Sequence, residues 1–520
     1  MIGRITRLAG TVMALLVHLA PPADAATPCA GGMAGPYPCR NVDLMALVTL
    51  PAMGCTQGNT VWGWTDPLTG KEYALMGCTD GVSFLDVSNP ESPRYLGRLP
   101  TQSFNSIWRD IKVYADHAFV VSEAAEHGLQ VFDLRRLRGA TGPPVVFTPS
   151  AHYEGFHHAH TIALDEPTGF AYALGTETCG RGLHMVDVRN PAVPVFAGCF
   201  SQDGYTHDAQ CVVYAGPDAR YRGREVCFAS NEDTLTIVDV TDKSAPVMLS
   251  RTGYAGYSYT HQGWLTEDHR YFLLDDEYDE ANFGHNTRTY VWDVSLLDAP
   301  KAPWTYTAAT TASDHNQYVR GRYVYQANYR AGLRILDLND IGNRNLTEVA
   351  FFDTFPSSDA SGTVGAWNNY PFFASGTVLV SGINEGLFVL RPAIPPEALR
   401  FHTVAPCRVA DTRDPAGPFG GPPLSPGQDR IFAIAGRCGV PATARAVAIN
   451  LTVAGPTAQG HLRIYPGSVL PFASVMNYRP GQVRANNAIV GLSGGGGLTV
   501  RADQAAGSVH VLIDVAGYFD

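Results

Sequence analysis

One short pattern recurs through residues 81–392, each time as an apolar run that ends on an aspartate. The copies read "GVSFLDV", "GLQVFDL", "GLHMVDV", "TLTIVDV", "RTYVWDV", "GLRILDL" and the shorter "GLFVLRP". Six of them share the aspartate: Asp86, Asp133, Asp187, Asp239, Asp293 and Asp337. A fixed period of about 50 residues with four short strands per unit is typical of a β-propeller blade, and a β-helix would need much shorter repeats. The regular recurrence of the aspartates indicates turn and packing roles.

Each unit can be divided into four strands that are rich in β-branched and aromatic residues and separated by Gly, Asn and Asp. The last unit, "NNYPFFA", "TVLVSGI" and "GLFVLRP", has only three. The segment "NVDLMALVTLP" at 41–51 precedes the first unit and is one strand too many. We therefore predict that residues 26–392 form a seven-bladed β-propeller in which 41–51 supplies the outer strand of the last blade, which would remove two sheet edges.

A proline-rich stretch at 393–406 has the composition of a linker. Beyond it, short alternating strands such as "ARAVAINLTV" and "GLTVRAD" predict a small β-sandwich over 407–520, so that the fold class is all-β throughout. The stretches "PCRVADTR", "CGVP" and "DVAGYF" resemble a C-terminal module of many exported bacterial proteins. Asp411, Thr412 and Arg413 within it could bind a ligand, such as a glycan, or form a structural turn held by an internal ion pair.

Residues 1–25 have the features of a signal peptide. Arg4 and Arg7 precede the short apolar stretch "LAGTVMALLVHLA", and "ADA" at 23–25 is a small-x-small cleavage site. The apolar stretch is too short to span a bilayer, and we expect no transmembrane segment after cleavage. The sequence thus predicts a secreted or cell-surface protein.

Export changes how the ten cysteines are interpreted, because an even number in an oxidising compartment favours disulfides. Connectivity does not follow from sequence, and proximity alone suggests the pairs Cys29–Cys39, Cys55–Cys78, Cys179–Cys199, Cys211–Cys227 and Cys407–Cys438.

Stretches in all the repeats carry a more specific resemblance. "LHMVDV" and "LTIVDV" resemble the LVIVD repeat, and "WRDIKVY", "YTHDAQ", "THQGWLTEDH", "DHNQYV" and "YQANYRAGLRILDL" resemble the choice-of-anchor B family of exported bacterial proteins. The resemblance covers roughly residues 40–392. It implies a surface or secreted propeller followed by an anchoring device, and it implies no activity.

The net charge of −11 and the lack of a basic run argue against nucleic acid as a partner, since phosphate binding needs a clustered positive face. We expect a monomer whose partner is an extracellular ligand or protein.

Histidines open the first strands of four consecutive repeats, and these openings should share one face of the ring. They are His160, His207, His261 and His315, with His158 two residues before the first of them. Neutral imidazoles are frequent ligands of transition metals, so we expect a divalent metal there, with Asp208 and Asp110 as partners that orient the rings. The alternative is that each histidine locks neighbouring blades together.

The ends of the second strands should reach the same face, and they are rich in carboxylates. We therefore include Glu123, Glu177, Asp276 and Glu277, together with Arg109 and Asp110, as ligand-binding candidates. Arg109 could clamp an anion or be held in a buried pair. The acidic run "DDEYDE" at 275–280 could hold calcium, although a plain solvated loop is the alternative.

Three hypotheses follow. The first is a secreted propeller that binds a ligand or partner on its top face, with or without a metal there. The second is a metal-dependent hydrolase or oxidase that uses the histidines. The third is purely structural adhesion. No phosphate-binding glycine loop is present, and no catalytic residue can be named.

Overall fold

The computed structural model describes residues 26–140, 142–395, 399–467, 470–493 and 495–520. The chain divides into two compact units at Pro395 and Pro396, and each is described by itself. The expected signal peptide, residues 1–25, lies outside the described residues. No helix in the described part of the chain is long and apolar enough to cross a membrane.

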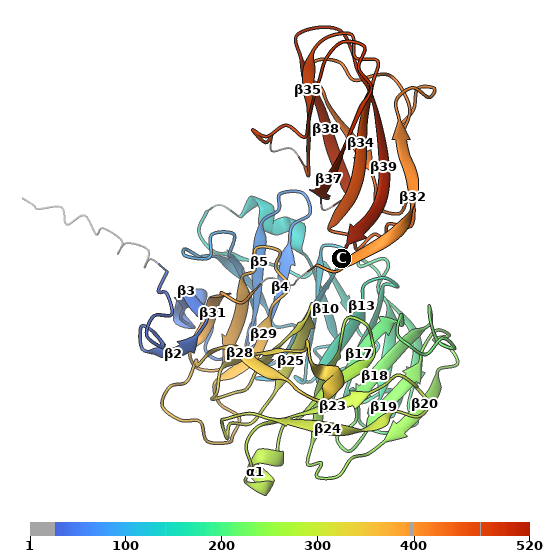
Figure 1. Ribbon diagram of the computed structural model, residues 1–520. Coiled ribbons are helices and arrows are strands. Elements are labelled where there is room, and N and C mark those ends of the chain that lie inside the picture. Colours follow the sequence, from blue (N-terminus) through green and yellow to red (C-terminus); the bar gives the residue numbers. More distant parts are fainter. Residues whose placement is uncertain (1–25, 141, 396–398, 468–469, 494) are drawn as a thin grey trace, which may run out of the picture. The chain divides into compact units, whose positions relative to one another are not determined.

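The described residues of the first unit form seven sheets, each built on four antiparallel strands (Figure 1). The first three sheets contain β4 (Gly58–Thr65), β5 (Glu72–Cys78), β6 (Gly81–Asp86) and β7 (Arg94–Pro100); β8 (Arg109–Tyr114), β9 (His117–Ser122), β10 (Leu129–Asp133) and β12 (Ala151–Tyr153); and β13 (Thr161–Asp165), β14 (Phe170–Leu174), β15 (Leu183–Asp187) and β16 (Val195–Phe200). The short β11 (Val145–Val146) runs parallel to β7.

The next three sheets follow the same order along the chain. They contain β17 (Asp208–Val213), β18 (Glu225–Ser230), β19 (Leu235–Asp239) and β20 (Val247–Thr252); β21 (Thr260–Leu265), β22 (Tyr271–Asp276), β23 (Arg288–Asp293) and β24 (Lys301–Thr307); and β25 (Asn316–Arg320), β26 (Tyr323–Ala327), β27 (Leu333–Asp337) and β28 (Thr347–Phe352). The only α-helix described is α1 (Asp279–Phe283), and the 3₁₀ helices are Pro51–Met53, Leu134–Gly139, Cys179–Arg181 and Ile341–Asn343.

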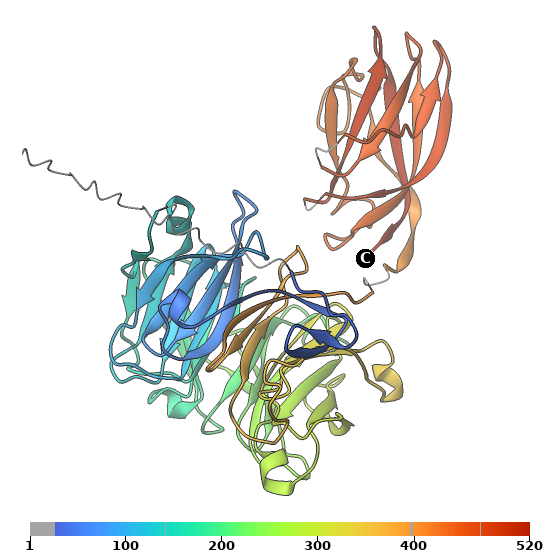
Figure 2. The same cartoon turned by 90° about the vertical axis from the view of Figure 1, so that its left-hand side faces the viewer.

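The N-terminal segment completes the last two sheets (Figure 1 and Figure 2). The seventh sheet contains β29 (Ala366–Tyr370), β30 (Val378–Gly382), β31 (Gly386–Pro392) and, as its outer strand, β3 (Val42–Val48). β3 pairs with β31 from Val42 opposite Pro392 to Val48 opposite Leu387, which is the position expected for residues 41–51. Two further strands, β1 (Met33–Ala34) and β2 (Tyr37–Arg40), extend the sixth sheet beyond β28.

The first strands of the seven sheets form a closed cycle. β4, β8, β13, β17, β21, β25 and β29 each pack against the next, and β29 packs against β4. Side-chain amides reinforce this inner cycle: Gln262 donates its Nε2 to the Gln317 carbonyl (3.1 Å) and accepts the Gln317 backbone N–H (3.0 Å). Residues at the openings of different first strands are therefore brought close together although they lie about 50 residues apart in the chain.

The recurring aspartates close the third strands, and all six have the same role. Each carboxylate accepts the backbone N–H of the residue two positions on, in the manner of an Asx turn. The donors are Ser88, Arg135, Arg189, Thr241, Ser295 and Asn339, at 2.9–3.1 Å. The turn role inferred from the repeat is confirmed.

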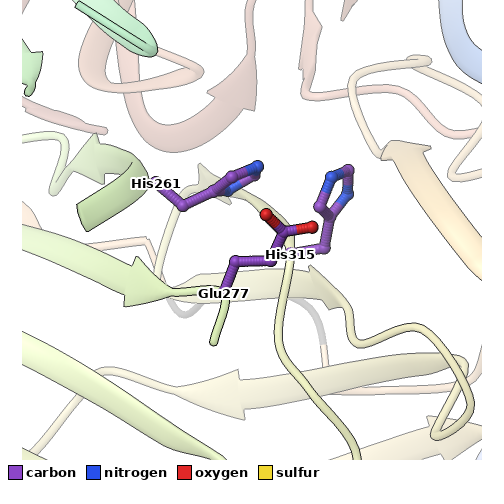
Figure 3. Close-up of side chains that lie close together, drawn as sticks. All are labelled: His261, Glu277 and His315. Atoms are coloured by element: carbon purple, nitrogen blue, oxygen red, sulfur yellow. The ribbon is translucent and has the colours of Figure 1, made fainter. Parts of the chain in front are cut away.

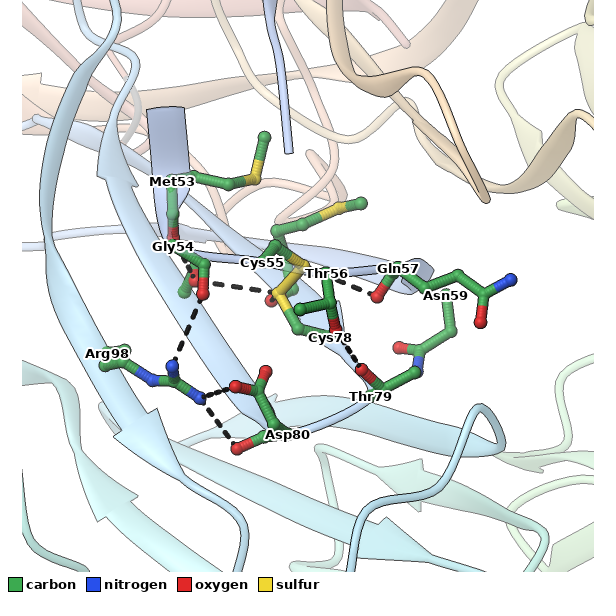
Figure 4. Close-up of a disulfide and its surroundings, with 12 residues drawn as sticks. Met53, Gly54, Cys55, Thr56, Gln57, Asn59, Cys78, Thr79, Asp80 and Arg98 are labelled. Atoms are coloured by element: carbon green, nitrogen blue, oxygen red, sulfur yellow. Dashed lines mark hydrogen bonds and ion pairs between the residues drawn. A yellow bond between two sulfur atoms is a disulfide. The ribbon is translucent and has the colours of Figure 1, made fainter. Parts of the chain in front are cut away.

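The structure pairs the ten cysteines as the sequence suggested: Cys29–Cys39, Cys55–Cys78, Cys179–Cys199, Cys211–Cys227 and Cys407–Cys438. Figure 4 shows the second of these, which joins the loop before β4 to the end of β5. Nearby, Arg98 forms an ion pair with Asp80 (2.7 Å) and donates to the Gly54 carbonyl (3.3 Å), so the segment is held from two sides. Five such bonds fit a protein that folds outside the reducing cytosol.

The second unit has two four-stranded sheets. One contains β32 (Phe401–Asp411), β39 (His510–Phe519), β34 (Ala446–Ala454) and β37 (Arg484–Gly491), and the other contains β33 (Asp429–Ala433), β38 (Gly497–Gln504), β35 (Gly460–Tyr465) and β36 (Met476–Tyr478). Alternate residues of both sheets, such as Leu451, Ile513 and Leu498, are buried in one apolar cluster. Because β32 starts at Phe401, the segment 401–406 is strand, although we expected it to belong to the linker.

Candidate functional site

The four histidines that open consecutive repeats lie side by side. His160, His207 and His315 directly precede β13, β17 and β25, and His261 is the second residue of β21. The distances between ring centroids of neighbours are 4.3 Å, 4.2 Å and 4.4 Å in chain order. The closed cycle of first strands accounts for this row, because equivalent positions of adjacent sheets face one another.

All four imidazoles use the same nitrogen to hold their orientation. In each ring Nδ1 lies within hydrogen-bond distance of an oxygen, which fixes the Nδ1–H tautomer and leaves a lone pair on Nε2. The acceptors are Glu123 Oε1 for His160 (2.5 Å), the His261 carbonyl for His207 (2.9 Å), Asp275 Oδ1 for His261 (2.8 Å) and the Trp367 carbonyl for His315 (2.5 Å). A histidine that binds a metal through one nitrogen typically donates the other to a carboxylate or carbonyl in this way.

Burial keeps three of these rings neutral. His207, His261 and His315 are 4%, 2% and 4% exposed. Loss of solvation lowers the pKa of His207 and His261 well below the usual value and lowers the pKa of His315 to about 3. At neutral pH their Nε2 atoms are therefore free to accept a hydrogen bond or to bind a metal.

Glu277 adds an oxygen donor to the row. It follows the last residue of β22, and its carboxylate lies between the imidazoles of His261 and His315 (Figure 3). Potential ligand atoms of these three residues all lie within 4.8 Å of one another. Tyr329 donates its hydroxyl to Glu277 Oε1 (2.6 Å), which fixes the carboxylate. Two imidazoles and one carboxylate are a donor set that suits a divalent transition metal and leaves coordination positions open.

These groups border a cavity of about 330 Å³ with an aromatic wall. The wall includes Trp108, Tyr205, Tyr259, Tyr329 and Trp367. Sequence reasoning missed the tyrosines, although a signal was present: "YTH" occurs at 205–207 and again at 259–261, which places a tyrosine two residues before a histidine in two successive repeats. A pocket of this size, lined by aromatic rings together with imidazoles and two carboxylates, suits a small organic ligand or a side chain of a partner.

Two of the predicted residues lie elsewhere. His158 does not border the cavity, and its ring faces Glu177 (Nδ1 to Oε2, 3.6 Å). Glu177 accepts the backbone N–H of His157 (2.7 Å) and so holds this loop. We therefore remove His158 from the candidate metal ligands and Glu177 from the ligand-binding residues, whereas Glu123 keeps a place as the partner of His160.

Asp110 and Asp208 do not orient the histidines. Asp110 forms an ion pair with Lys112 (2.8 Å) and accepts from Thr60 Oγ1 (3.1 Å) and from the Ile162 N–H (3.1 Å), so it ties neighbouring sheets together. Asp208 accepts its neighbour's N–H (2.6 Å), and burial raises its pKa to about 7. The orienting groups are Glu123, Asp275 and two backbone carbonyls instead.

Arg109 is a structural residue. It is 2% exposed, and its guanidinium donates to the Cys78 carbonyl (3.1 Å) and to Thr101 Oγ1 (2.9 Å) and contacts His127 Nε2 (2.9 Å). Because these neighbours occupy the donors, the structure favours the buried link between sheets, one of the two interpretations of Arg109, over the anion clamp.

The acidic run 275–280 does not form one calcium loop. Asp275 faces His261, whereas Asp276 accepts the N–H groups of Ser258 (2.7 Å) and Tyr259 (2.6 Å) and the hydroxyl of Tyr254 (2.7 Å). Asp276 thus uses its carboxylate to hold the preceding loop, and we remove it from the ligand-binding candidates. The run is also not a solvated loop, because five of its six residues are buried; the exception is Tyr278.

In the second unit, the trio at 411–413 forms the internal turn that was one of the two interpretations. The Asp411 carboxylate accepts from the backbone N–H (3.1 Å), Nε (2.9 Å) and a terminal nitrogen (2.7 Å) of Arg413, and Arg408 adds a fourth donor (3.2 Å). These bonds hold the pKa of Asp411 at about 2.

This turn predicts an acid-dependent stability. An unfolded aspartate has a pKa of about 3.9, so the lowered folded value adds stability above that pH, and the contribution is lost as the pH falls through 2. Both arginines are about half exposed, and we expect Asp411→Asn to lower the free energy of unfolding by about 1 kcal/mol at pH 7 and by almost nothing near pH 1. Denaturant melts at the two pH values measure it, with Asp414→Asn, exposed in the same turn, as the control. An equal loss at both pH values would refute the ion-pair explanation.

Comparison with known proteins adds a repeat and a structural likeness. Residues 226–252, which span most of β18, β19 and β20, match the model of the LVIVD repeat. A comparison with curated proteins finds no match. Among solved structures, the β-propeller domain of Cps50 (Swd1) from Myceliophteria thermophila is similar at 11% identity and a TM-score of 0.41, over 67% of this chain and 98% of that one. The chain is thus an all-β protein of four-stranded antiparallel sheets that carries an LVIVD repeat.

Proposed function

We propose that this protein is an exported seven-bladed β-propeller followed by a β-sandwich domain, and that it binds an extracellular ligand or protein through a transition metal held by His261, Glu277 and His315. The N-terminal 25 residues would direct export, and the second unit would serve attachment. The observation that carries the proposal is the row of four imidazoles, each with its Nδ1 within hydrogen-bond distance of an oxygen, beside the Glu277 carboxylate.

The arrangement favours metal binding over blade locking for a physical reason. A histidine that only locks two sheets would use both ring nitrogens in hydrogen bonds, because an unpaired buried nitrogen costs free energy. Here the second nitrogens of adjacent rings face a cavity that also receives the Glu277 carboxylate. His160 and His207 continue the row and would contact a ligand bound at the open positions of the metal.

The test is the zinc content of the purified full chain. We expect dialysis against Zn²⁺ to load this site and Glu277→Gln, which keeps the side-chain volume, to remove about one zinc per chain. His158→Ala, a histidine of the same face outside the cavity, should keep the wild-type content. An equal zinc content per chain in the wild type and in Glu277→Gln would refute the proposed site.

A metal-dependent hydrolase or oxidase is the second candidate. It is favoured by one feature: a donor set of two histidines and one carboxylate leaves positions open for water or substrate beside the 330 Å³ cavity. Hydrolysis of simple esters and phosphate esters, assayed with the zinc-loaded chain and with the chelator-treated chain, separates the two. Activity that disappears with chelator and in Glu277→Gln would favour the enzyme.

A further inference from the structure

A second group of titratable side chains follows Glu277 in the chain. This group is not part of the candidate metal site. Asp279 and Glu280 begin α1, and His285 follows two residues after that helix ends. Potential ligand atoms of the three lie within 4.8 Å of one another. Asp279 is 0% exposed and Glu280 is 2% exposed. Two carboxylates this close and this deeply buried repel each other unless a cation or a proton lies between them.

Each member of the group has one atom held by a hydrogen bond and another without one, although His285 Nε2 lies at ion-pair distance from Asp279 Oδ2 (3.6 Å). Asp279 Oδ2 accepts from Tyr290 (2.7 Å), Glu280 Oε1 accepts the Arg288 N–H (3.1 Å), and His285 Nδ1 donates to the Asn286 carbonyl (2.9 Å). The opposite atoms, Asp279 Oδ1, Glu280 Oε2 and His285 Nε2, are buried and have no hydrogen-bond partner. The held atoms fix the side chains, so the free atoms remain as donors.

Asp314, in the loop before β25, is a further buried carboxylate. It is 1% exposed, and neither carboxylate oxygen has a hydrogen-bond partner. Among the described residues, no lysine or arginine forms an ion pair with Asp279, Glu280 or Asp314. Native proteins rarely leave such atoms unsatisfied, and an ion is one of the few physical reasons.

We propose that Asp279, Glu280 and His285 form a second cation site, which binds a divalent ion such as Mn²⁺ or Zn²⁺. One nitrogen beside two carboxylates favours these ions over Ca²⁺, which prefers oxygen ligands throughout. The expectation of calcium at 275–280 is thereby changed both in residues and in metal.

The experiment uses the full chain with His261→Ala, so that the candidate site at His261, Glu277 and His315 does not contribute. We expect Mn²⁺, added after chelator treatment at about 100 times its dissociation constant, to raise Tm by about 4 °C. Asp279→Asn with Glu280→Gln in the same background should lose this shift. It should not lose stability without metal, because the two substitutions keep the volume and remove two buried charges.

Glu91→Gln, an exposed neutralisation in another sheet, is the matched control and should keep the full shift. An equal Mn²⁺ response in the double variant, or no response to Mn²⁺ and Zn²⁺ in the His261→Ala chain, would overturn the second site and mean that a shared proton relieves the repulsion. The zinc content of Glu277→Gln tests only the site at His261, Glu277 and His315. Either proposal can therefore be refuted without the other.

Discussion

Replacing His315 with alanine is expected to weaken Zn²⁺ binding at the cavity by at least about 100-fold, more than the loss of an orienting partner normally costs. His315 supplies one of three donors, and with the Nδ1 bond to Trp367 its Nε2 is presented without any rearrangement. Two donors remain after the substitution, and neither gains a replacement. Competition with a chromophoric chelator measures the affinity.

The titration is best carried out in the Asp279→Asn, Glu280→Gln chain, so that only one site responds. His158→Ala is the control, since its ring faces Glu177 outside the cavity, and it should bind zinc as the parent does. A His315→Ala chain that keeps its affinity would show that the row of imidazoles has a structural role only.

Replacing Asp275 with alanine is expected to lower the free energy of unfolding by about 3 kcal/mol and zinc affinity by about 10-fold or more. The buried carboxylate accepts from His261 Nδ1 (2.8 Å), the Gln262 N–H (3.0 Å) and Gln317 Nε2 (3.2 Å). Removing it leaves three donors without an acceptor at the junction of two sheets. It also frees the His261 ring to change tautomer and to rotate.

Urea denaturation and zinc titration of the same samples measure the two effects. Asp187→Ala is a suitable control because its carboxylate closes a third strand and pairs with an arginine that is 63% exposed, so it should cost less than about 1 kcal/mol. A loss in Asp275→Ala no larger than in Asp187→Ala would contradict the central role of this carboxylate.

The periodic elements of the fold were readable from sequence. The recurring aspartates predicted turns because an Asx turn depends on one side chain and its own backbone, which is local chemistry. The histidine row was also predictable, since equivalent positions of adjacent sheets must meet once the strands form a cycle. The surplus strand at 41–51 could be placed by counting alone, because an unpaired edge is costly.

What failed to follow from sequence was the direction of individual carboxylates. Asp275, Asp276 and Glu277 are consecutive, yet they serve a histidine ring, a loop backbone and the candidate metal site, respectively. Alternation along a strand that ends at this point decides which way each one points, and the end of a strand is not fixed to one residue by sequence pattern. The two interpretations of Arg109 could not be separated for a similar reason, because its partners Cys78 and Thr101 belong to other segments.

The pairing of β3 with β31 joins residues separated by more than 330 positions. A chain is synthesised with its N-terminus first, so β3 must wait without its partner until residues 387–392 have been made. During that interval its backbone groups are free to pair with another molecule or with a chaperone that binds extended apolar segments. The yield of folded protein should therefore respond more strongly to substitutions in β3 than its modest burial suggests.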